Sequence, residues 1–402
     1  MERTVAILGT LDTKGVEYKF VKDRIEADGV STLVIDVGVG GQPTFTPDIS
    51  ASEVAKAAGV DLNDLIKERD RGRSIAIICE GAAAIVKDLY QRGKFQGLIS
   101  LGGSGGTSIG TAAMQALPTG VPKLMVSTMA SGNTRPYMGT KDITMMPSVV
   151  DIAGINRLSR QILANAAGAI AGMVKVNVKA ETESKPLVAA TMFGVTTPCV
   201  TQARAILESA GYEVLVFHAT GTGGRAMEGL IRDGFIKCVL DVTAAELADE
   251  LVGGVLNAGP NRMEAAGELG IPQVIVPGAL DMVNLGPPET VPDKFKGRRF
   301  YQHNPTVTIT RTTGDENAQL GKIIAEKLNR AKGPTTVVIP KKGFSAYDSE
   351  GQPFYDTEAD AAFVKSLKSN LGEQVKLIEM DNHINDEQFA RTIANLLLDN
   401  ME

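Results

Sequence analysis

The chain has 402 residues, of which 41 are Lys or Arg and 47 are Asp or Glu, and its formal net charge is −6. A chain without excess positive charge has little to hold it on a nucleic-acid backbone or an anionic membrane surface, which argues against general binding of either kind. Apolar residues make up 43% of the chain and charged residues 22%, which is typical of globular proteins, and the length predicts two or three domains.

The cysteines and the N-terminal residues indicate the cellular compartment in which the protein works. Cys79, Cys199 and Cys238 are odd in number and lie in apolar runs, which favours reduced thiols over a disulfide framework or a metal site. The opening residues MERTVAILGT hold no apolar stretch of signal-peptide length, and no run of about 18 apolar residues occurs in the chain. We therefore expect a cytoplasmic protein that does not span a membrane.

Short apolar runs alternate with stretches of helical periodicity along the chain. This βαβ rhythm predicts an α/β fold built from mostly parallel sheets that are buried on both faces. The run SIAIIC, residues 74–79, is interpreted as a further strand that ends before Glu80. The polar segment 175–186, which ends at Pro186, predicts a linker between a domain at 1–180 and a domain at 181–402. The other expected strands are 5–8, 33–37, 98–101, 124–126, 187–190, 214–217, 238–240 and 274–276.

The two halves repeat one plan. TVAILGTLDTK parallels LVAATMFGVTT, and IEADGVSTLVIDVGVGG parallels LESAGYEVLVFHATGTGG. Further on, GLISLGGSGG parallels CVLDVTAAE, and VPKLMVSTMASGN parallels IPQVIVPGALDMVN. We therefore expect two doubly wound, Rossmann-like domains that arose by internal duplication, with ligands at the carboxyl ends of the strands and a substrate in the cleft between the domains.

A glycine-rich loop follows the strand GLISL and precedes a helical stretch. Its members are Gly102, Gly103, Ser104, Gly105, Gly106 and Thr107. Glycines let the backbone approach an anion closely, and the following helix offers free N–H groups, so the loop predicts a phosphate site. It is not a Walker A loop, because no Lys-Ser/Thr pair closes it, and it departs from G-x-G-x-x-G spacing at Ser108. The alternative is a turn that only permits tight packing.

Three other loops of the first half are expected at the same sheet edge. Asp12, Thr13 and Lys14 follow the first strand, so that Lys14 would meet a phosphate and Asp12 a metal-bound water, unless Thr13 merely caps a helix. Asp36 ends the second strand, where an acidic residue accepts hydrogen bonds from ribose hydroxyls. Ser131, Gly132 and Asn133 follow the fourth strand and suit a base or phosphate contact, although a plain turn explains them equally well.

The second half holds more reactive side chains. In HATGTGGRAME, residues 218–228, we expect an anion or carboxylate site that uses Arg225, since the G-x-G-x-x-A match follows the second strand of its half rather than the first. Acid/base work on a small polar substrate is predicted for these residues, although structural roles such as capping a helix or bracing a turn fit as well: Arg225, Glu228, Asp241, Asp281, Asn284 and His303. The aromatic and basic loop 340–355 would close over a site or form a dimer contact.

Taken in order, the motifs GTLDTK, GGSGGT, FGVTTPCV, HATGTGGRAME, GALDMVN, HNP and PKKGFS resemble those of the tobamovirus-resistance-protein-like ATP-binding family. That family takes its name from the N-terminal domain of a tomato protein that blocks viral RNA replication. The resemblance covers nearly the whole chain and implies two Rossmann-like domains, ATP or a related nucleotide bound with Mg²⁺, and a homodimer. It assigns the nucleotide to Asp12, Thr13, Lys14 and the loop 102–107. In plant members the region is fused to a barrel-like domain, which we do not expect here.

From these features we expect a cytoplasmic ATP-binding enzyme that uses Mg-ATP on a small polar or carboxylate metabolite. Two alternatives stay open. The first is a nucleotide-sensing dimeric module without catalysis, for which the acidic and cationic groups after Gly221 are dispensable. The second is a nucleotide-independent lyase or isomerase in the second half.

Overall fold

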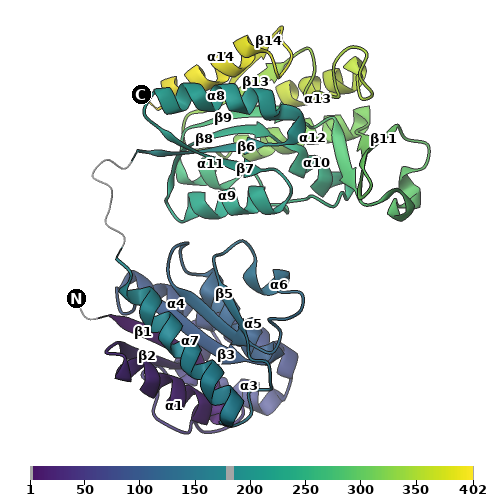
Figure 1. Ribbon diagram of the computed structural model, residues 1–402. Coiled ribbons are helices and arrows are strands. Elements are labelled where there is room, and N and C mark those ends of the chain that lie inside the picture. The colour runs from purple at the N-terminus through teal and green to yellow at the C-terminus, as the bar shows by residue number, and fades with distance from the viewer. Residues whose placement is uncertain (1–2, 178–184, 402) are drawn as a thin grey trace. The chain divides into compact units, whose positions relative to one another are not determined.

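The computed structural model describes residues 3–177 and 185–401, which form two compact units, Met1–Ala180 (unit 1) and Glu181–Glu402 (unit 2) (Figure 1). The boundary falls within the segment 175–186 that the sequence marks as a linker. Most of that segment, 178–184, lies outside the described residues.

Unit 1 is built on a five-stranded, wholly parallel sheet with the strand order β2-β1-β3-β4-β5. Its strands are β1 (Thr4–Gly9), β2 (Ser31–Asp36), β3 (Gly97–Gly102), β4 (Lys123–Ser127) and β5 (Thr144–Pro147). Its helices are α1 (Leu11–Ala27), α2 (Ala51–Ala57), α3 (Leu62–Glu68), α4 (Arg71–Gln91), α5 (Ser104–Gln115), α6 (Arg135–Met138) and α7 (Arg157–Lys175).

Alternate residues of the strands in unit 1 belong to two different hydrophobic cores, one on each face of the sheet. In β1, Val5 and Ile7 pack with buried side chains of α1 and α7, whereas Ala6 and Leu8 pack with those of α4 and α5. Successive strand residues point to opposite faces, so a strand that is apolar throughout must be covered on both sides. The doubly wound arrangement expected from the sequence is therefore confirmed.

The helix α4 corrects one sequence interpretation, because it contains the run 74–79 that we expected to be a strand. The run is apolar by itself, but the buried positions of the whole segment recur every three or four residues, at Ser74, Ile78, Ala82, Val86 and Leu89. Asp70 caps the helix by accepting a hydrogen bond from Arg73 N at 3.0 Å. The helical period over 21 residues outweighs the local strand-like composition.

Unit 2 has a six-stranded parallel sheet with the order β14-β13-β9-β8-β6-β7 and a small antiparallel sheet with the order β10-β12-β11. Its strands are β6 (Leu187–Met192), β7 (Glu213–His218), β8 (Ile236–Thr243), β9 (Gln273–Gly278), β10 (Met282–Leu285), β11 (Phe300–Asn304), β12 (Val307–Arg311), β13 (Thr335–Pro340) and β14 (Lys376–Met380). Its helices are α8 (Thr197–Ser209), α9 (Thr222–Arg232), α10 (Ala245–Val252), α11 (Ala265–Leu269), α12 (Gly314–Leu328), α13 (Thr357–Asn370) and α14 (Glu387–Asp399).

The two parallel sheets share one plan. The order β7-β6-β8-β9 in unit 2 repeats the order β2-β1-β3-β4 in unit 1, and each strand corresponds to the one that the aligned segments predict. The units differ where the chain adds elements. Unit 1 inserts α2 and α3 before α4, between its second and third strands, whereas unit 2 has α9 alone at that place.

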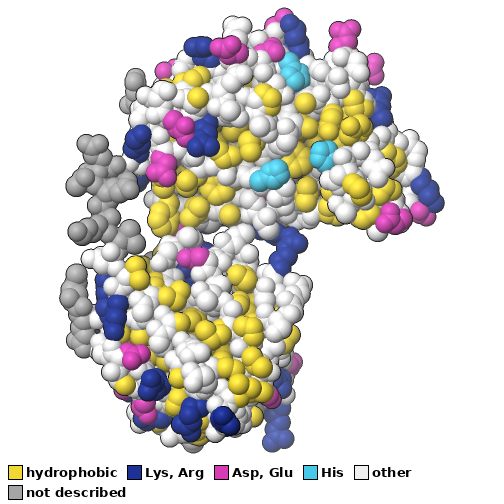
Figure 2. All heavy atoms as spheres, in the orientation of Figure 1, with side chains coloured by type: hydrophobic (Ala, Val, Ile, Leu, Met, Phe, Trp, Pro, Cys, Tyr) yellow, Lys and Arg dark blue, Asp and Glu magenta, His cyan; other side chains and the backbone are white. Residues whose placement is uncertain are grey.

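The surface is consistent with the modest net charge. On the face that Figure 2 shows, basic and acidic side chains are interspersed on both units, without a large basic patch. None of the described helices is both long enough and apolar enough to cross a membrane. All three cysteines are free thiols, and Cys199 and Cys238 are buried.

Candidate functional site

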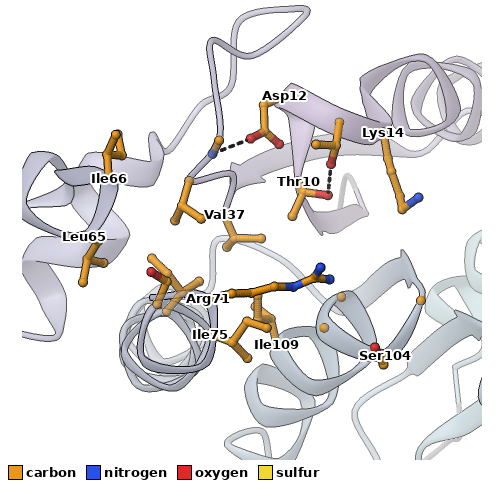
Figure 3. Close-up of a pocket in the computed structure, with 18 of the residues that line it drawn as sticks. Thr10, Asp12, Lys14, Val37, Leu65, Ile66, Arg71, Ile75, Ser104 and Ile109 are labelled. Carbon is orange, nitrogen blue, oxygen red and sulfur yellow. Dashed lines mark hydrogen bonds between the residues drawn. The ribbon is translucent and has the colours of Figure 1, made fainter. Parts of the chain in front are cut away.

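A cavity of about 700 Å³ lies in unit 1 at the carboxyl ends of the strands β1, β2 and β3 (Figure 3). This nucleotide-sized cavity is bounded by the loops after β1 and β2, by α3 and α4, and by the start of α5. It is lined by Thr10, Asp12, Thr13, Lys14, Val37, Val39, Gly40, Leu65, Ile66, Arg69, Arg71, Ser74, Ile75, Ile78, Gly103, Ser104, Gly105, Gly106 and Ile109.

The start of α5 presents backbone donors to this cavity. The helix begins at Ser104 with Gly103 as its N-cap residue, so Gly105 and Gly106 belong to its first turn. The backbone N–H groups of Ser104, Gly105 and Gly106 have no acceptor among the described residues, as expected for the first turn of a helix. A Cβ on Gly102 would lie 2.7 Å from Gly106 Cα, so the strand and the helix approach each other closely here. Free donors and the positive end of the helix dipole together favour an anion.

Three cations line the same cavity. Arg69 and Arg71 are exposed and have no ion-pair or hydrogen-bond partner among the residues that the structure describes. In Figure 3 the side chain of Arg71 extends from α4 toward the start of α5. Lys14 donates a hydrogen bond from Nζ to the carbonyl oxygen of Ile152 and keeps its remaining N–H groups for another acceptor.

Asp12 is held by a glycine loop that follows β2. Its Oδ2 accepts from Gly40 N at 2.7 Å, whereas its Oδ1 is buried and has no partner within the described chain. A Cβ on Gly38 would lie 2.6 Å from Oδ1, so only glycine allows this approach. The unpaired oxygen is suited to a donor or a cation that a ligand brings.

The other predicted nucleotide contacts lie beside the cavity. Asp36 is buried, and its Oδ1 accepts from Leu11 N and Gly38 N, which fixes the loops after β1 and β2. Burial raises the pKa of Asp36. Thr107 is fully buried, and its hydroxyl forms hydrogen bonds with the hydroxyl of Ser127 and with the carbonyl oxygen of Gly102. It therefore holds the glycine-rich turn and does not line the cavity. Ser131, Gly132 and Asn133 occupy an exposed loop after β4 outside the cavity lining.

In unit 2, two of the predicted catalytic carboxylates meet at a buried arginine. Arg262 is 1% exposed, and its guanidinium donates to Asp241 Oδ1 at 2.7 Å and to Glu246 Oε2 at 2.7 Å, with Glu228 Oε1 at 3.8 Å. Glu228 also accepts from the backbone of Met263 and Ala265. Glu228 and Asp241 are therefore part of a buried ion network, and their catalytic role stays a prediction.

The expected anion site at the start of α9 is occupied by the chain itself. Glu246 Oε1 accepts from Gly221 N at 2.6 Å and from Gly224 N at 3.0 Å. A Cβ on Gly224 would lie 2.0 Å from Glu246 Oε2, so the glycine makes room for this carboxylate. Arg225 is half-buried and takes no part in the network. The backbone donors of this glycine-rich turn are thus taken by an internal carboxylate, and a ligand site that uses Arg225 stays a prediction.

The three remaining predicted residues lie in separate surroundings. Asn284 is buried and bonds Asp249 through its backbone N–H at 2.7 Å. Asp281 is buried and accepts from Ser345 Oγ at 2.8 Å. His303 lies on the exposed strand β11 beside the hydroxyl of Tyr347. None of the six predicted catalytic residues lines the nucleotide-sized cavity.

Asp281 belongs to a cluster of buried carboxyl groups around Arg311. Burial, together with the neighbouring Asp281 and Asp360, raises the pKa of Asp348 to about 9, and burial raises that of Asp281 to about 6. Arg311 Nη2 donates to Asp360 at 2.6 Å and lies 3.7 Å from Asp348.

We predict that Asp348→Asn lessens the loss of stability of unit 2 at high pH. A carboxyl whose pKa is raised in the folded state stabilises that state fully below its unfolded pKa and ceases to do so as pH rises toward 9. Asparagine imitates the neutral form, so the variant avoids a slope of at most about 1.4 kcal/mol per pH unit. Urea unfolding at pH 5 and pH 9 measures this, and equal pH dependence in the wild type and the variant would contradict it.

Both units match one protein family. Residues 3–179 match the N-terminal domain, and residues 185–401 the C-terminal domain, of the family described as "Uncharacterised protein family (UPF0261)". The chain belongs to this family. A UPF0261 protein of Clostridium tetani is 58% identical over 403 residues and covers 100% of both chains. The ToMV resistance protein Tm-1(GCR237) of Solanum lycopersicum is 40% identical over 422 residues, which span 98% of this chain and 55% of the tomato protein.

The resemblance inferred from the sequence motifs is thereby confirmed, and the UPF0261 chain spans about half the length of its tomato relative. Among solved structures, one titled UDP-N-acetylglucosamine 2-epimerase aligns with 69% of this chain and 79% of its own at 11% identity and a TM-score of 0.23, a similarity too low to argue from.

The sequence predicted the glycine-rich and Asp12–Lys14 sides of the cavity but missed its α3–α4 side. Ile75 was overlooked because the run 74–79 was interpreted as a strand, which would have placed it in the sheet, and Arg69 and Arg71, which precede that run, were assigned no role. The helical spacing of the buried residues from Ser74 to Leu89 is the signal that would have placed Arg71 on a helix facing the cavity.

Proposed function

We propose that unit 1 binds ATP as its magnesium complex in the nucleotide-sized cavity. The observation that carries this proposal is the set of three backbone N–H groups at the start of α5 that have no acceptor within the described chain and lie at the same cavity as Arg71 and Lys14. A triphosphate supplies the acceptors that these donors lack. The family resemblance implies the same ligand.

The cavity also suits the nucleoside. Its volume of about 700 Å³ lies within the usual range of small-molecule sites. Val39, Leu65, Ile66 and Ile75 give it an apolar wall, and Ile66 is 46% exposed. Covering such side chains with a purine ring would remove apolar surface from water.

The residues fit a magnesium ion held mainly by phosphate oxygens. Mg²⁺ retains several waters and takes one or two carboxylates together with substrate phosphates. Asp12 offers a buried, unpaired Oδ1 on the cavity wall. Nowhere in residues 3–177 or 185–401 do three or more His, Cys, Asp or Glu side chains form a metal-binding group, so the phosphates would supply the other ligands. The ion, when bound, would neutralise phosphate charge.

We predict that Arg71→Gln weakens ATP binding about tenfold, since a charge-assisted hydrogen bond to phosphate contributes about 1.5–3 kcal/mol. Arg73→Gln is the matched control, because Arg73 lies on the same helix, pairs with Glu68 and does not line the cavity. It should keep affinity within about twofold. Calorimetric titration of both variants with Mg-ATP measures the difference, and an equal effect of the two substitutions would contradict the placement of the phosphates.

We predict that Asp12→Asn removes the dependence of ATP binding on magnesium. Asparagine keeps an oxygen for Gly40 N but loses the charge that a hydrated cation requires. Magnesium should tighten ATP binding to the wild type about tenfold relative to EDTA, and should not tighten it in the variant. Titrations with and without magnesium measure this, and an unchanged magnesium effect in the variant would exclude Asp12 as its ligand.

Two candidate functions differ in what the protein does with bound ATP. Chemistry on a small polar or carboxylate metabolite is the first, and sensing without turnover is the second. The second is favoured by one observation, that Glu228 and Asp241 are committed to Arg262 and are not free for acid/base work. Phosphate release at saturating Mg-ATP, with a panel of sugar acids and keto acids, separates them. Release that requires one metabolite supports the enzyme, and binding without release supports the sensor.

A further inference from the structure

A second cavity, of about 510 Å³, lies in unit 2 between α13, the end of β13 and the loop that follows this strand. We call it the lysine groove. Val364, which is half-buried, and Tyr355, which is 38% exposed, give it apolar surface, and the buried Ile339 and Phe344 lie beside it. None of the residues that we expected to be catalytic lines it. Part of its lining comes from the basic and aromatic loop 340–355 that the sequence singles out.

The groove has four lysines on its lining and an excess of positive charge. They are Lys341, Lys342, Lys365 and Lys368. Its two acidic residues are already paired, since Glu379 accepts from Lys368 at 2.6 Å and Asp360 accepts from Arg311 at 2.6 Å. Lys342 lies 3.3 Å from Asp381 in an exposed pair. Lys341 and Lys365 have no side-chain partner among the described residues, so both charges are available to a ligand.

The lysines are held on a well-anchored frame. Lys365 and Lys368 lie on α13, on the same face as Ala361 and Val364, which also line the groove. The loop that carries Lys341 is fixed because Phe344 is buried and its N–H donates to Asp348 Oδ2 at 2.9 Å. Gly343, with φ of +123°, permits the turn, since a Cβ there would lie 1.6 Å from the carbonyl oxygen of Asp348. The cations are therefore presented around an apolar floor rather than on a flexible tail.

We propose that the lysine groove binds a small organic anion, a carboxylate or phosphate attached to an apolar body. An apolar lining with a few convergent charged groups is the usual composition of a small-molecule site. The apolar body would cover Val364 and Tyr355, and the anionic group would meet Lys341 and Lys365. This site is independent of ATP binding in unit 1.

The chain contains no tryptophan, so Tyr355→Trp places a single fluorescent reporter on the groove. Three nitroaromatic quenchers of similar shape serve as probes: 4-nitrobenzoate, 4-nitrophenyl phosphate and the neutral 4-nitrobenzamide. We expect saturable quenching by one or both anions at concentrations where the amide quenches only in proportion to its concentration. The two anions show whether carboxylate or phosphate is preferred. Added salt should weaken the anion binding, because exposed charges are screened.

Lysine variants test the assignment of the charges. In the Tyr355→Trp background, Lys341→Gln with Lys365→Gln should weaken anion binding roughly tenfold, because the two exposed charges that face the anion are lost. Lys237→Gln with Lys332→Gln, two exposed lysines outside the groove, is the matched control and should leave it unchanged. Equilibrium dialysis of 4-nitrobenzoate against the wild type removes any dependence on the reporter. Absence of saturable binding by either method, equal binding of the amide, or equal effects of the two lysine pairs would overturn the proposal.

Discussion

The variant Gly105→Val should bind ATP at least about a hundredfold more weakly than the wild type, because the loss of two charge-assisted hydrogen bonds corresponds to about 3 kcal/mol or more. Gly105 lies in the first turn of α5, and a Cβ there already lies 3.1 Å from Ile75 Cδ1. The two valine methyl groups would occupy the space in front of the free N–H groups. The phosphates would then lose their close approach to the backbone.

The fold itself should tolerate this change. Gly105 has ordinary helical geometry, and the contact of its Cβ is with the flexible end of an isoleucine. Gly172→Val is the matched control, because Gly172 lies in a helix of the same unit and a Cβ there meets nothing within 4 Å. Titration calorimetry and thermal unfolding of both variants separate binding from folding. Retained ATP affinity in a folded Gly105→Val protein would refute the phosphate site at α5.

The largest effect on stability is expected from Arg262→Leu, which should destabilise unit 2 by roughly 3–5 kcal/mol, as for other buried ion pairs that lose one partner. The substitution leaves Asp241, Glu246 and Glu228 buried without their common counter-charge. Arg232→Gln is the control, because Arg232 is 42% exposed and meets Glu228 and Glu268 only at 3.7 and 3.5 Å. It should cost less than about 1 kcal/mol.

The pH dependence of the stability loss in Arg262→Leu is a second, independent test of this prediction. Burial raises the pKa of Glu228 and Arg262 lowers it, so without Arg262 the pKa of Glu228 rises further in the folded state, which then binds more protons than the unfolded state. The deficit of Arg262→Leu should therefore be smaller at pH 5 than at pH 8. Scanning calorimetry of the full chain follows the transition of unit 2. A deficit that is small, or that does not change with pH, would show that Arg262 does not hold these carboxylates.

Much of the architecture could be predicted from the sequence because parallel strands and their loops leave strong local signals. The apolar runs predicted eight of the strands, and the matched segments predicted the shared strand order. The glycines at 102–106 predicted a close backbone turn, because that signal depends on conformational freedom and not on distant contacts. The small antiparallel sheet of β10, β11 and β12 was not predicted.

The partners of buried charges could not be predicted, because they depend on contacts between distant segments. Glu246 bonds the backbone at Gly221, 25 residues away, and Asp281 bonds Ser345, 64 residues away. A carboxylate that is held by Arg262 and one that is free for catalysis have the same sequence signature. The six residues that we expected to act together in unit 2 were therefore grouped by their chemistry alone, and the structure brings only Glu228 and Asp241 together, at Arg262.

The central claim, ATP binding in unit 1, is tested most directly by calorimetric titration of the full wild-type chain with ATP in the presence of magnesium. We expect saturable binding of one ATP per chain, weakened when magnesium is replaced by EDTA and absent when adenosine replaces ATP at the same concentrations. Absence of binding at millimolar ATP, or equal binding of adenosine, would contradict a triphosphate held at the start of α5.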